Sequence, residues 1–417
     1  RLLQKAAGVG MIKLEEIKQL HLEITTRCNA ACPHCARNIY GAMRDPSFDL
    51  ADISLDEFKT AFPPAFIRQL KHIFMCGTYG EPTLAPDCLE IWKYIRENSH
   101  PALTSVSLHT NGGTKTPEWW AELAKHCRLV WFGIDGLEDT NHLYRQHVSW
   151  KKLMANVKAF IGAGGYAAWV VNVYKHNEHQ VEEMRALSKS LGFVNFVVRK
   201  TARFYLPHVG LVTKFPVFTP KGEISHFLEM PTQADHLNVQ FSQEERSEAE
   251  RNDQKAFETS ADFIERVRQY KVDYKKKWKA GALTEIPPVS EDVAKRFDGK
   301  PICCKTKMNK EIYLSASGLV WPCCFLSVHE WGQGYRQAQM DRIFDQVEDK
   351  MDSLNIRKHS LREIVEGDFF QKHIPESWKQ PKIGEGRIYE CAYWCPKENG
   401  YFDSQMESAP AEQSPAT

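Results

Sequence analysis

Short apolar runs alternate with amphipathic segments between residues 20 and 200. The apolar runs have the length and residue content of strands, and they lie at residues 21–25, 72–77, 105–110, 129–135, 168–174 and 194–199. The segments between them have the period of helices. This alternation predicts an α/β fold with a parallel sheet, either open or curved into a partial or full barrel. In such folds the chemistry gathers at the carboxyl ends of the strands.

Capping signals mark several of the predicted helices. Ser54 and Glu57 have the spacing of a capping box, and Thr116 precedes Pro117 as an N-cap residue would. Gly192 follows the last apolar positions of the helix predicted over residues 178–192, where glycine commonly ends a helix. These signals agree with the strand and helix order that the apolar pattern predicts.

The pattern changes after residue 200. Charged segments at residues 242–258 and 262–281 predict helices with solvated faces. Lysines at residues 275–277 would suit a basic patch, but the many neighbouring acids favour a solvated helix face. Strand-like pieces at residues 311–315 and 319–323 flank a turn, which predicts a β-hairpin with cysteines at both outer ends.

Composition describes a globular chain without a strong charge bias. Of 417 residues, 42% are hydrophobic and 26% charged, and 54 basic residues against 53 acidic ones give a net charge of +1. This balance gives no reason to expect nucleic acid or an anionic membrane as partner. No apolar run reaches about 18 residues, and no secretory signal is visible, so we expect a cytoplasmic protein. The sequence starts at Arg1 rather than Met, so the native N-terminus stays open, and Met11 is one candidate for it.

Twelve cysteines are many for a protein of the reducing cytoplasm, and most of them are clustered. Single cysteines such as Cys88 and Cys127 lie in predicted helical segments and are interpreted as small buried hydrophobic residues. The clustered positions indicate metal rather than disulfides; they are residues 28, 32 and 35, residues 303 and 304, residues 323 and 324, and residues 391 and 395.

Cys28, Cys32 and Cys35 follow the first predicted strand in the stretch RCNAACPHC. A structural zinc site would require a closed set of four ligands, and His34 is badly placed to be the fourth. Three thiolates in a tight loop also suit an iron-sulfur cluster, in which each cysteine holds one iron. The fourth iron would then keep an open position, which is typical of a catalytic metal site.

The spacing CxxxCxxC in this place resembles that of the radical S-adenosylmethionine (radical SAM) enzymes. The resemblance implies a partial (β/α)6 barrel in which Cys28, Cys32 and Cys35 bind three irons of a 4Fe-4S cluster. It also implies that SAM chelates the fourth iron through its amine and carboxylate. One electron then cleaves SAM to methionine and a 5'-deoxyadenosyl radical, which abstracts hydrogen from a substrate.

The stretch GTYGEP after the second predicted strand is similar to the Gly-Gly-Glu-Pro motif of this family. Gly80, Glu81 and Pro82 match, so the resemblance implies that they receive the amino group of SAM. Tyr79 departs from the pattern because it occupies the place of the first glycine. An ordinary turn is the structural alternative.

Further polar residues lie at predicted strand ends. HTNGG resembles the TNG turn of the family and places Thr110 and Asn111 near the cofactor. In GIDG, Asp135 matches the family aspartate, for a ribose hydroxyl or substrate, while Gly133 replaces a serine; an aspartate that shapes its own turn is equally expected. The resemblance also places Asn172 near the ribose, Asn177 at the next turn, and His34 near adenine. A polar residue on an alternating strand, such as Asn172, is often only hydrogen-bonded to its neighbours, which is the structural alternative. Tyr79, Arg199 and Arg203 are candidates for substrate contact or for purely structural roles.

The hairpin cysteines resemble the C-terminal auxiliary-cluster domains called SPASM and Twitch. Thirteen residues separate Cys304 from Gly318 and four separate Gly318 from Cys323. With Cys391 and Cys395, these thiolates would form a closed set of four ligands for one auxiliary 4Fe-4S cluster. Zinc in the same site is the alternative. The choices between Cys303 and Cys304 and between Cys323 and Cys324 stay open.

The resemblance implies five regions. They are an N-terminal extension (1–18), a radical SAM core (19–205), a charged and largely helical connection (206–298), a SPASM- or Twitch-like domain (299–400) and a disordered tail (401–417).

Three functions follow, in decreasing order of preference. The first is a radical SAM enzyme that modifies a peptide or protein side chain. The second is a radical SAM oxidoreductase of a small molecule, and the third is a noncatalytic zinc scaffold. Both enzymes would need an external one-electron donor such as flavodoxin or ferredoxin. About twenty residues precede the first predicted strand, too few for the winged-helix domain that binds leader peptides in many peptide maturases, so peptide recognition is expected elsewhere.

Overall fold

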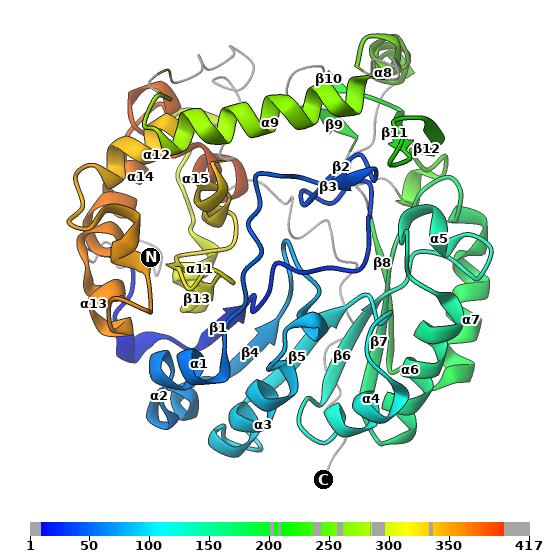
Figure 1. Ribbon diagram of the computed structural model, residues 1–417, viewed down its shortest axis with the longest axis horizontal. Coiled ribbons are helices and arrows are strands. Elements are labelled where there is room, and N and C mark those ends of the chain that lie inside the picture. Colours follow the sequence, from blue (N-terminus) through cyan, green and yellow to red (C-terminus); the bar gives the residue numbers. More distant parts are fainter. Residues whose placement is uncertain are drawn as a thin grey trace. The chain divides into compact units, whose positions relative to one another are not determined.

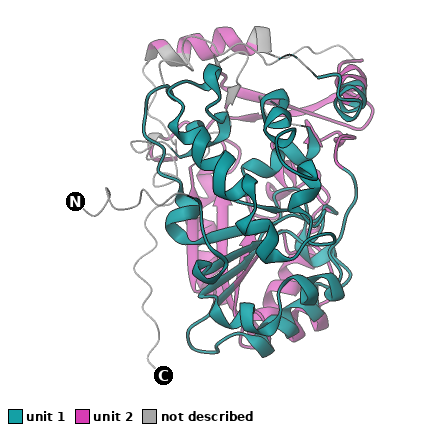
Figure 2. Ribbon diagram, turned by 90° about the vertical axis from the view of Figure 1, so that its left-hand side faces the viewer, with its two compact units in different colours: residues 1–27, 49–106, 272–399 teal, residues 28–48, 107–271, 400–417 magenta. Residues whose placement is uncertain are grey.

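A computed structural model describes residues 10–200, 204–206, 210–236, 243–256, 262–283, 285, 297–332 and 337–395. Arg203 and the tail at residues 401–417 lie outside the described residues. The chain divides into two compact units that are discontinuous in sequence (Figure 2). Unit 1 comprises residues 1–27, 49–106 and 272–399, and unit 2 comprises residues 28–48, 107–271 and 400–417. The predicted domain boundaries run in chain order and stay a prediction.

Unit 1 contains four neighbouring strands in the order β14-β13-β1-β4. Strand β1 (Gln19–Leu22) pairs in parallel with β4 (His72–Met75) on one side and with β13 (Glu311–Leu314) on the other. Strand β14 (Val320–Trp321) pairs with β13 in antiparallel direction. The predicted hairpin is therefore confirmed, and it joins the first strand of the chain in one sheet.

Helices α1 (Leu55–Ala61), α2 (Pro64–Gln69) and α3 (Cys88–Asn98) follow the first two strands of unit 1. The predicted capping box is present in α1, where Ser54 accepts from the Glu57 amide and Glu57 from the Ser54 amide. The rest of unit 1 is mostly short helices, which are η2 (Leu14–Glu16), η3 (Pro82–Leu84), α11 (Lys305–Asn309), η6 (Leu326–Trp331), α12 (Gln337–Phe344), η7 (Lys350–Leu354), α13 (Leu361–Glu366), η8 (Phe369–His373), α14 (Ile374–Lys379), η9 (Ile383–Glu385) and α15 (Tyr389–Trp394).

Unit 2 contains parallel strands in the order β5-β6-β7-β8, the order in which they follow one another in the chain. They are β5 (Ser105–Thr110, in this unit from Ser107 on), β6 (Leu129–Gly133), β7 (Tyr166–Asn172) and β8 (Asn195–Arg199). Helices α4, α6 and α7 lie along one side of β6, β7 and β8 (Figure 1). The helices of this part are α4 (Pro117–Leu123), α5 (Asn141–Tyr144), α6 (Trp150–Gly162), η4 (Glu178–Gln180) and α7 (Val181–Leu191).

The charged segment after β8 contains an antiparallel hairpin that the apolar pattern did not predict. Strand β11 (Lys214–Phe218) pairs with β12 (Ile224–Glu229), and Gly222 takes a φ of +84° in the turn between them. The two helices predicted here are confirmed as α8 (Gln243–Ala256) and α9 (Phe263–Lys279). The remaining elements of unit 2 are β2 (Asn38–Ile39), β3 (Met43–Arg44), β9 (Tyr205–Leu206), β10 (Gly210–Leu211) and η5 (Ala234–His236).

The six predicted strands of the core are all present, with ends that differ by at most two residues, except that β1 ends three residues before the predicted end. Their parallel pairings within each unit and the helices between them confirm the predicted α/β fold. None of the helices in the described part of the chain is both long and apolar enough to span a bilayer.

Candidate functional site

The stretch with three cysteines forms a series of tight turns in unit 2, and we call residues 28–35 the cysteine loop. The Cys35 amide donates to the Cys32 carbonyl at 3.1 Å, and the Asn38 amide donates to the Cys35 carbonyl at 2.9 Å. The Asn38 side chain also donates to the Cys32 carbonyl, at 3.1 Å. Cys32 is buried, whereas Cys28 and Cys35 are half-buried.

Hydrogen-bond donors converge on two of the three sulfurs. The Cys28 Sγ accepts from the Ala30 amide at 3.4 Å and from Asn111 Nδ2 at 3.9 Å. The Cys32 Sγ accepts from Arg145 Nη1 at 3.9 Å. Donors directed at sulfur stabilise thiolates and raise the reduction potential of iron-sulfur clusters. The predicted residue Asn111 therefore lies beside the loop, while Thr110 accepts from the Gly112 amide at 2.9 Å.

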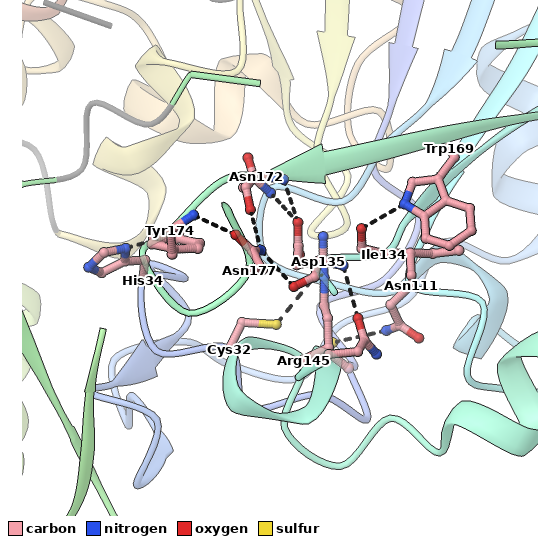
Figure 3. A network of polar contacts seen from close by, with 12 residues as sticks. Cys32, His34, Asn111, Ile134, Asp135, Arg145, Trp169, Asn172, Tyr174 and Asn177 are labelled. Carbon is pink, nitrogen blue, oxygen red and sulfur yellow. Dashed lines mark hydrogen bonds and ion pairs between the residues drawn. The ribbon is translucent and has the colours of Figure 1, made fainter. Parts of the chain in front are cut away.

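An ion pair between the buried Asp135 and the half-buried Arg145 forms the centre of a polar network (Figure 3). Asp135 follows β6 and is fully buried, and its Oδ2 accepts from Arg145 Nε at 2.5 Å. Its Oδ1 accepts from the amide of Asn172 at 2.6 Å and from Asn172 Nδ2 at 3.0 Å. Asn177 Nδ2 donates to the Asp135 carbonyl at 2.8 Å. The ends of β6 and β7 are thereby joined beside the cysteine loop.

This network also has electrostatic consequences for Cys32. Burial raises the pKa of the Cys32 thiol to about 11, and the positive charge of Arg145 opposes that rise. Burial lowers the pKa of Arg145, but Asp135 and Cys32 outweigh it and leave that pKa well above its ordinary value. Arg145 therefore stays a cation beside the Cys32 sulfur, where it would stabilise a thiolate.

The position of Arg145 accounts for Gly133, the glycine that replaces a serine of the family pattern. A Cβ atom at this position would lie 2.3 Å from Arg145 Nη2, far inside van der Waals contact. The serine that the family often has here would therefore displace the guanidinium from Asp135 and Cys32. Arg145 directly follows α5, as its C-cap residue. Nothing in the local sequence indicated that it would pair with Asp135.

His34 lies among aromatic side chains of unit 2. Its ring contacts Phe215 edge to face at a centroid distance of 4.3 Å and Phe204 at 5.5 Å. Its Nδ1 lies 3.2 Å from the Tyr174 hydroxyl. An aromatic surround of this kind suits a flat ring such as adenine, and the contact with adenine stays a prediction.

In unit 1, the GTYGEP loop (residues 77–82) follows β4. Gly80 packs so closely that a Cβ atom there would lie 1.9 Å from the Thr25 carbonyl oxygen. Glu81 is buried, and its carboxylate accepts from the Thr83 amide at 3.3 Å and from the Thr83 hydroxyl at 2.7 Å. Pro82 begins η3. The tyrosine in the place of the family glycine, Tyr79, is also buried and therefore does not extend toward solvent.

Four cysteines of unit 1 line a single cavity, which we call the four-cysteine cavity. They are Cys304, Cys323, Cys391 and Cys395, while the neighbouring Cys303 and Cys324 do not line it. The cavity is partly open to solvent. Most of the other lining residues are apolar, namely Met11, Ile302, Pro322, Phe325, Leu326, Ile374, Trp378 and Trp394.

Burial raises the pKa of all four thiols in the cavity, that of Cys395 to about 11. Free thiolates are therefore unfavourable here, and bound metal would have to displace the protons. The Trp378 indole N–H is buried without a hydrogen-bond partner among the described residues. It lies close enough to Cys391 to lower the pKa of that thiol, against the larger effect of burial.

The donor sets of both cysteine sites are compatible with iron-sulfur clusters, in which each thiolate holds a different iron. Among the described residues, no three cysteine, histidine or carboxylate side chains meet closely enough to hold one metal ion. The sulfur-directed donors of the cysteine loop and the unpartnered indole of the cavity also suit sulfur-rich groups.

Arg199, another candidate from the sequence, ends β8 and is half-buried. Sequence reasoning missed Arg145, Trp378 and the buried Glu23. Only Glu23 carried a signal, because it is a charged residue within the apolar run HLEIT.

Two family models match the chain. One describes the radical SAM superfamily and matches residues 22–188, and the other, SPASM, describes an iron-sulfur cluster-binding domain and matches residues 303–395. The first covers the cysteine loop and the GTYGEP loop, and the second covers the four-cysteine cavity's thiols.

Curated relatives match over part of their length. A tungsten-containing aldehyde ferredoxin oxidoreductase cofactor-modifying protein of Pyrococcus furiosus is 32% identical over 29% of this chain and 32% of its own. The mycofactocin maturase MftC of Mycobacterium ulcerans is 28% identical over 41% of this chain and 44% of its own. The chain thus spans less than half the length of each of these two relatives.

Solved structures are more distant in sequence. The structure of anSMEcpe with bound AdoMet is 15% identical and covers 93% of this chain and 91% of that one, with a TM-score of 0.44. Streptococcus suis SuiB bound to S-adenosylmethionine is 14% identical and covers 76% of this chain and 61% of that one, with a TM-score of 0.42. Similarity at this level assigns no function.

Proposed function

We propose that this chain, which belongs to the radical SAM superfamily and carries a C-terminal SPASM iron-sulfur domain, modifies a peptide or protein side chain. The observation that carries the radical chemistry is the contrast between its two cysteine sets. One has three thiols and donors directed at sulfur, and the other has four thiols in a largely apolar cavity. An incomplete set leaves a position for a reactant, and a complete set does not.

In this proposal Cys28, Cys32 and Cys35 hold the cluster that binds SAM. When bound, that cluster and SAM together supply a 5'-deoxyadenosyl radical that abstracts hydrogen from the substrate. Asn111 and the Ala30 amide stabilise the Cys28 thiolate, and Arg145 stabilises that of Cys32.

The roles of the other residues around SAM follow from the family resemblance. Gly80, Glu81 and Pro82 receive the amino group, while Thr110, Asn111, Asp135 and Asn172 line the nucleoside, and His34 contacts adenine. Asp135 and Asn172 already bond each other at 2.6 Å and 3.0 Å, so SAM would meet a preformed pair.

Cys304, Cys323, Cys391 and Cys395 would hold one auxiliary 4Fe-4S cluster. The proposal selects Cys304 over Cys303 and Cys323 over Cys324 because only the first of each pair lines the cavity. With four protein ligands, this cluster has no open position for substrate, and its role is electron transfer. A flavodoxin or ferredoxin would supply the external electron.

The peptide substrate is supported by the relationship to mycofactocin maturase MftC. The alternative substrate, a small molecule, is supported by the relationship to a cofactor-modifying protein. The peptide is preferred because the resemblance to enzymes with this auxiliary domain implies modification of peptides and proteins as the main class of reaction.

Anaerobic reconstitution tests the cofactors. We expect about eight irons per chain, four for each cluster, and formation of 5'-deoxyadenosine from SAM with a chemical reductant. Bound zinc without SAM cleavage would support the noncatalytic scaffold and overturn the proposal.

Deuterium transfer tests the substrate class. A short peptide encoded beside this gene, deuterated at carbon, is incubated with the reconstituted protein and SAM. Deuterium in 5'-deoxyadenosine and a change in peptide mass are expected. If deuterium instead comes only from a labelled small carbinol or sugar, the peptide assignment is wrong while the radical chemistry stands.

A further inference from the structure

Glu23 is a buried carboxylate that holds the GTYGEP loop. It follows β1 in unit 1 and is 1% exposed. Its Oε1 accepts from the Tyr79 amide at 2.5 Å and from the Gly80 amide at 3.0 Å. Its Oε2 accepts from the hydroxyl of Tyr313. Each oxygen of the carboxylate is therefore engaged, one by the loop and one by β13.

Strand β13 belongs to the region that matches the SPASM domain. Tyr313 is fully buried and lies opposite His21 in the register of β1 and β13. The Glu23 amide also donates to the Leu314 carbonyl at 2.9 Å. The Tyr313 side chain and the Leu314 backbone therefore both connect the SPASM region to Glu23, which holds the GTYGEP loop.

The loop also packs closely against the residues that follow Glu23. Gly80 has no space on the side of Thr25, where a Cβ atom would lie 1.9 Å from the carbonyl oxygen. The Glu81 amide donates to the Arg27 carbonyl at 2.7 Å. The positions of Gly80 and Glu81 therefore depend on the same short segment that contains Glu23.

We propose that Glu23 and Tyr313 are positioning residues for the SAM-binding loop, so that the SPASM region acts on SAM binding through a tyrosine and not only through its cysteines. This inference rests on the proposed function, because SAM binding by Gly80 and Glu81 is part of that proposal. Its physical basis is the donor that Tyr313 supplies to a carboxylate with no access to water.

The electrostatics of Glu23 support this dependence on donors. Burial raises the pKa of Glu23 to about 7, and the hydrogen bonds from Tyr313 and the Tyr79 amide lower it. Loss of the Tyr313 hydroxyl therefore makes the charged carboxylate less favourable and weakens its bonds to the two amides.

The experiment compares Tyr313→Phe with Tyr94→Phe in the reconstituted full-length protein. Tyr94 is a matched control because it is also a buried tyrosine of unit 1, and its hydroxyl donates to the Phe62 carbonyl at 3.0 Å. Two quantities are measured: hydrogen exchange at the Tyr79 and Gly80 amides, and the SAM dissociation constant from the change in the cluster's EPR spectrum.

For Tyr313→Phe we expect exchange at both amides to accelerate about tenfold and SAM affinity to fall about tenfold, with unchanged iron content. Glu23→Gln keeps one acceptor for the amides, so its effect on exchange should be smaller than that of Glu23→Ala. Wild-type exchange and affinity in Tyr313→Phe would overturn the inference, as would equal changes in Tyr94→Phe. If the wild-type protein binds no SAM, the proposed function fails, and the exchange rates alone then decide whether Glu23 and Tyr313 hold the loop.

Discussion

The cysteine loop of unit 2 and the four-cysteine cavity of unit 1 place the same side chain in opposite surroundings. In the loop, amide and guanidinium groups point at the sulfurs, and the Asp135–Arg145 pair lies behind them. In the cavity, most of the lining is apolar, and burial raises the pKa of every thiol. The polar site suits a cluster that exchanges charge with a bound reactant, whereas the apolar site suits a cluster with a stable ligand set.

The largest effect should come from the loop cysteines. Cys28→Ala, Cys32→Ala or Cys35→Ala should each abolish 5'-deoxyadenosine formation, because the cluster loses one of only three protein ligands. Iron content should fall from about eight to about four per chain. Cys127→Ala is the control, since this buried thiol belongs to neither set and donates to the Leu129 carbonyl at 3.5 Å. Retained SAM cleavage in a loop variant would contradict the open-site interpretation.

Neighbouring cysteines allow a matched test of the closed site. Cys304→Ser and Cys323→Ser should each lose about four irons and keep reductive SAM cleavage. Cys303→Ser and Cys324→Ser should keep full iron content, because their side chains do not line the cavity. Iron analysis and EPR of the reduced proteins measure both outcomes. A loss of iron in the second pair would show that the ligand set has been assigned to the wrong neighbours.

Arg145→Met tests the polar surroundings of the loop. It leaves Asp135 buried without its cation, which should lower the free energy of unfolding by about 3 kcal/mol. It also removes a donor from Cys32, so the reduction potential of the SAM-binding cluster should fall. Denaturant unfolding and EPR-monitored titration measure the two effects.

Arg185→Gln provides the reference for Arg145. Arg185 pairs with Glu182 on the surface, with side chains 45% and 81% exposed, and its loss should change the free energy of unfolding by less than about 1 kcal/mol. If both substitutions lowered the free energy of unfolding by the same amount, the Asp135–Arg145 pair would contribute no more to stability than an exposed pair.

The smallest effect should come from Trp378→Phe in the cavity. The substitution keeps an aromatic ring but removes the indole N–H near Cys391. In the metal-bound protein this N–H would donate to a sulfur of the auxiliary site. Loss of one such hydrogen bond of about 1 kcal/mol corresponds to about 40 mV for a one-electron couple, so the auxiliary cluster's potential should fall by that order. Iron content and the potential of the SAM-binding cluster should not change. A shift in the SAM-binding cluster alone would contradict this assignment of Trp378.

Local patterns were sufficient for most elements of the fold. Ser54, Thr116 and Gly192 each occupy the cap position that their residue type predicts, because capping depends on a few neighbouring residues. The hairpin of β11 and β12 was missed, since a buried run of Phe215 to Phe218 lacks the alternation that identifies a half-buried strand.

The sequence by itself determined the family and the positions of the two cysteine sets along the chain. The spacing of Cys28, Cys32 and Cys35 after an apolar strand, and of Cys304, Gly318 and Cys323 around a turn, identified two kinds of cysteine set, because ligand spacing within one loop or hairpin is a local property. The tertiary structure alone decided which residues distant in sequence contact the cysteine loop and hold the GTYGEP loop. Arg145 reaches Asp135 and Cys32, and Tyr313 reaches Glu23 from 290 residues away, through packing that no local pattern encodes. The tertiary structure also places the Arg145 guanidinium in the space beside Gly133, so that a side chain there would have to displace it.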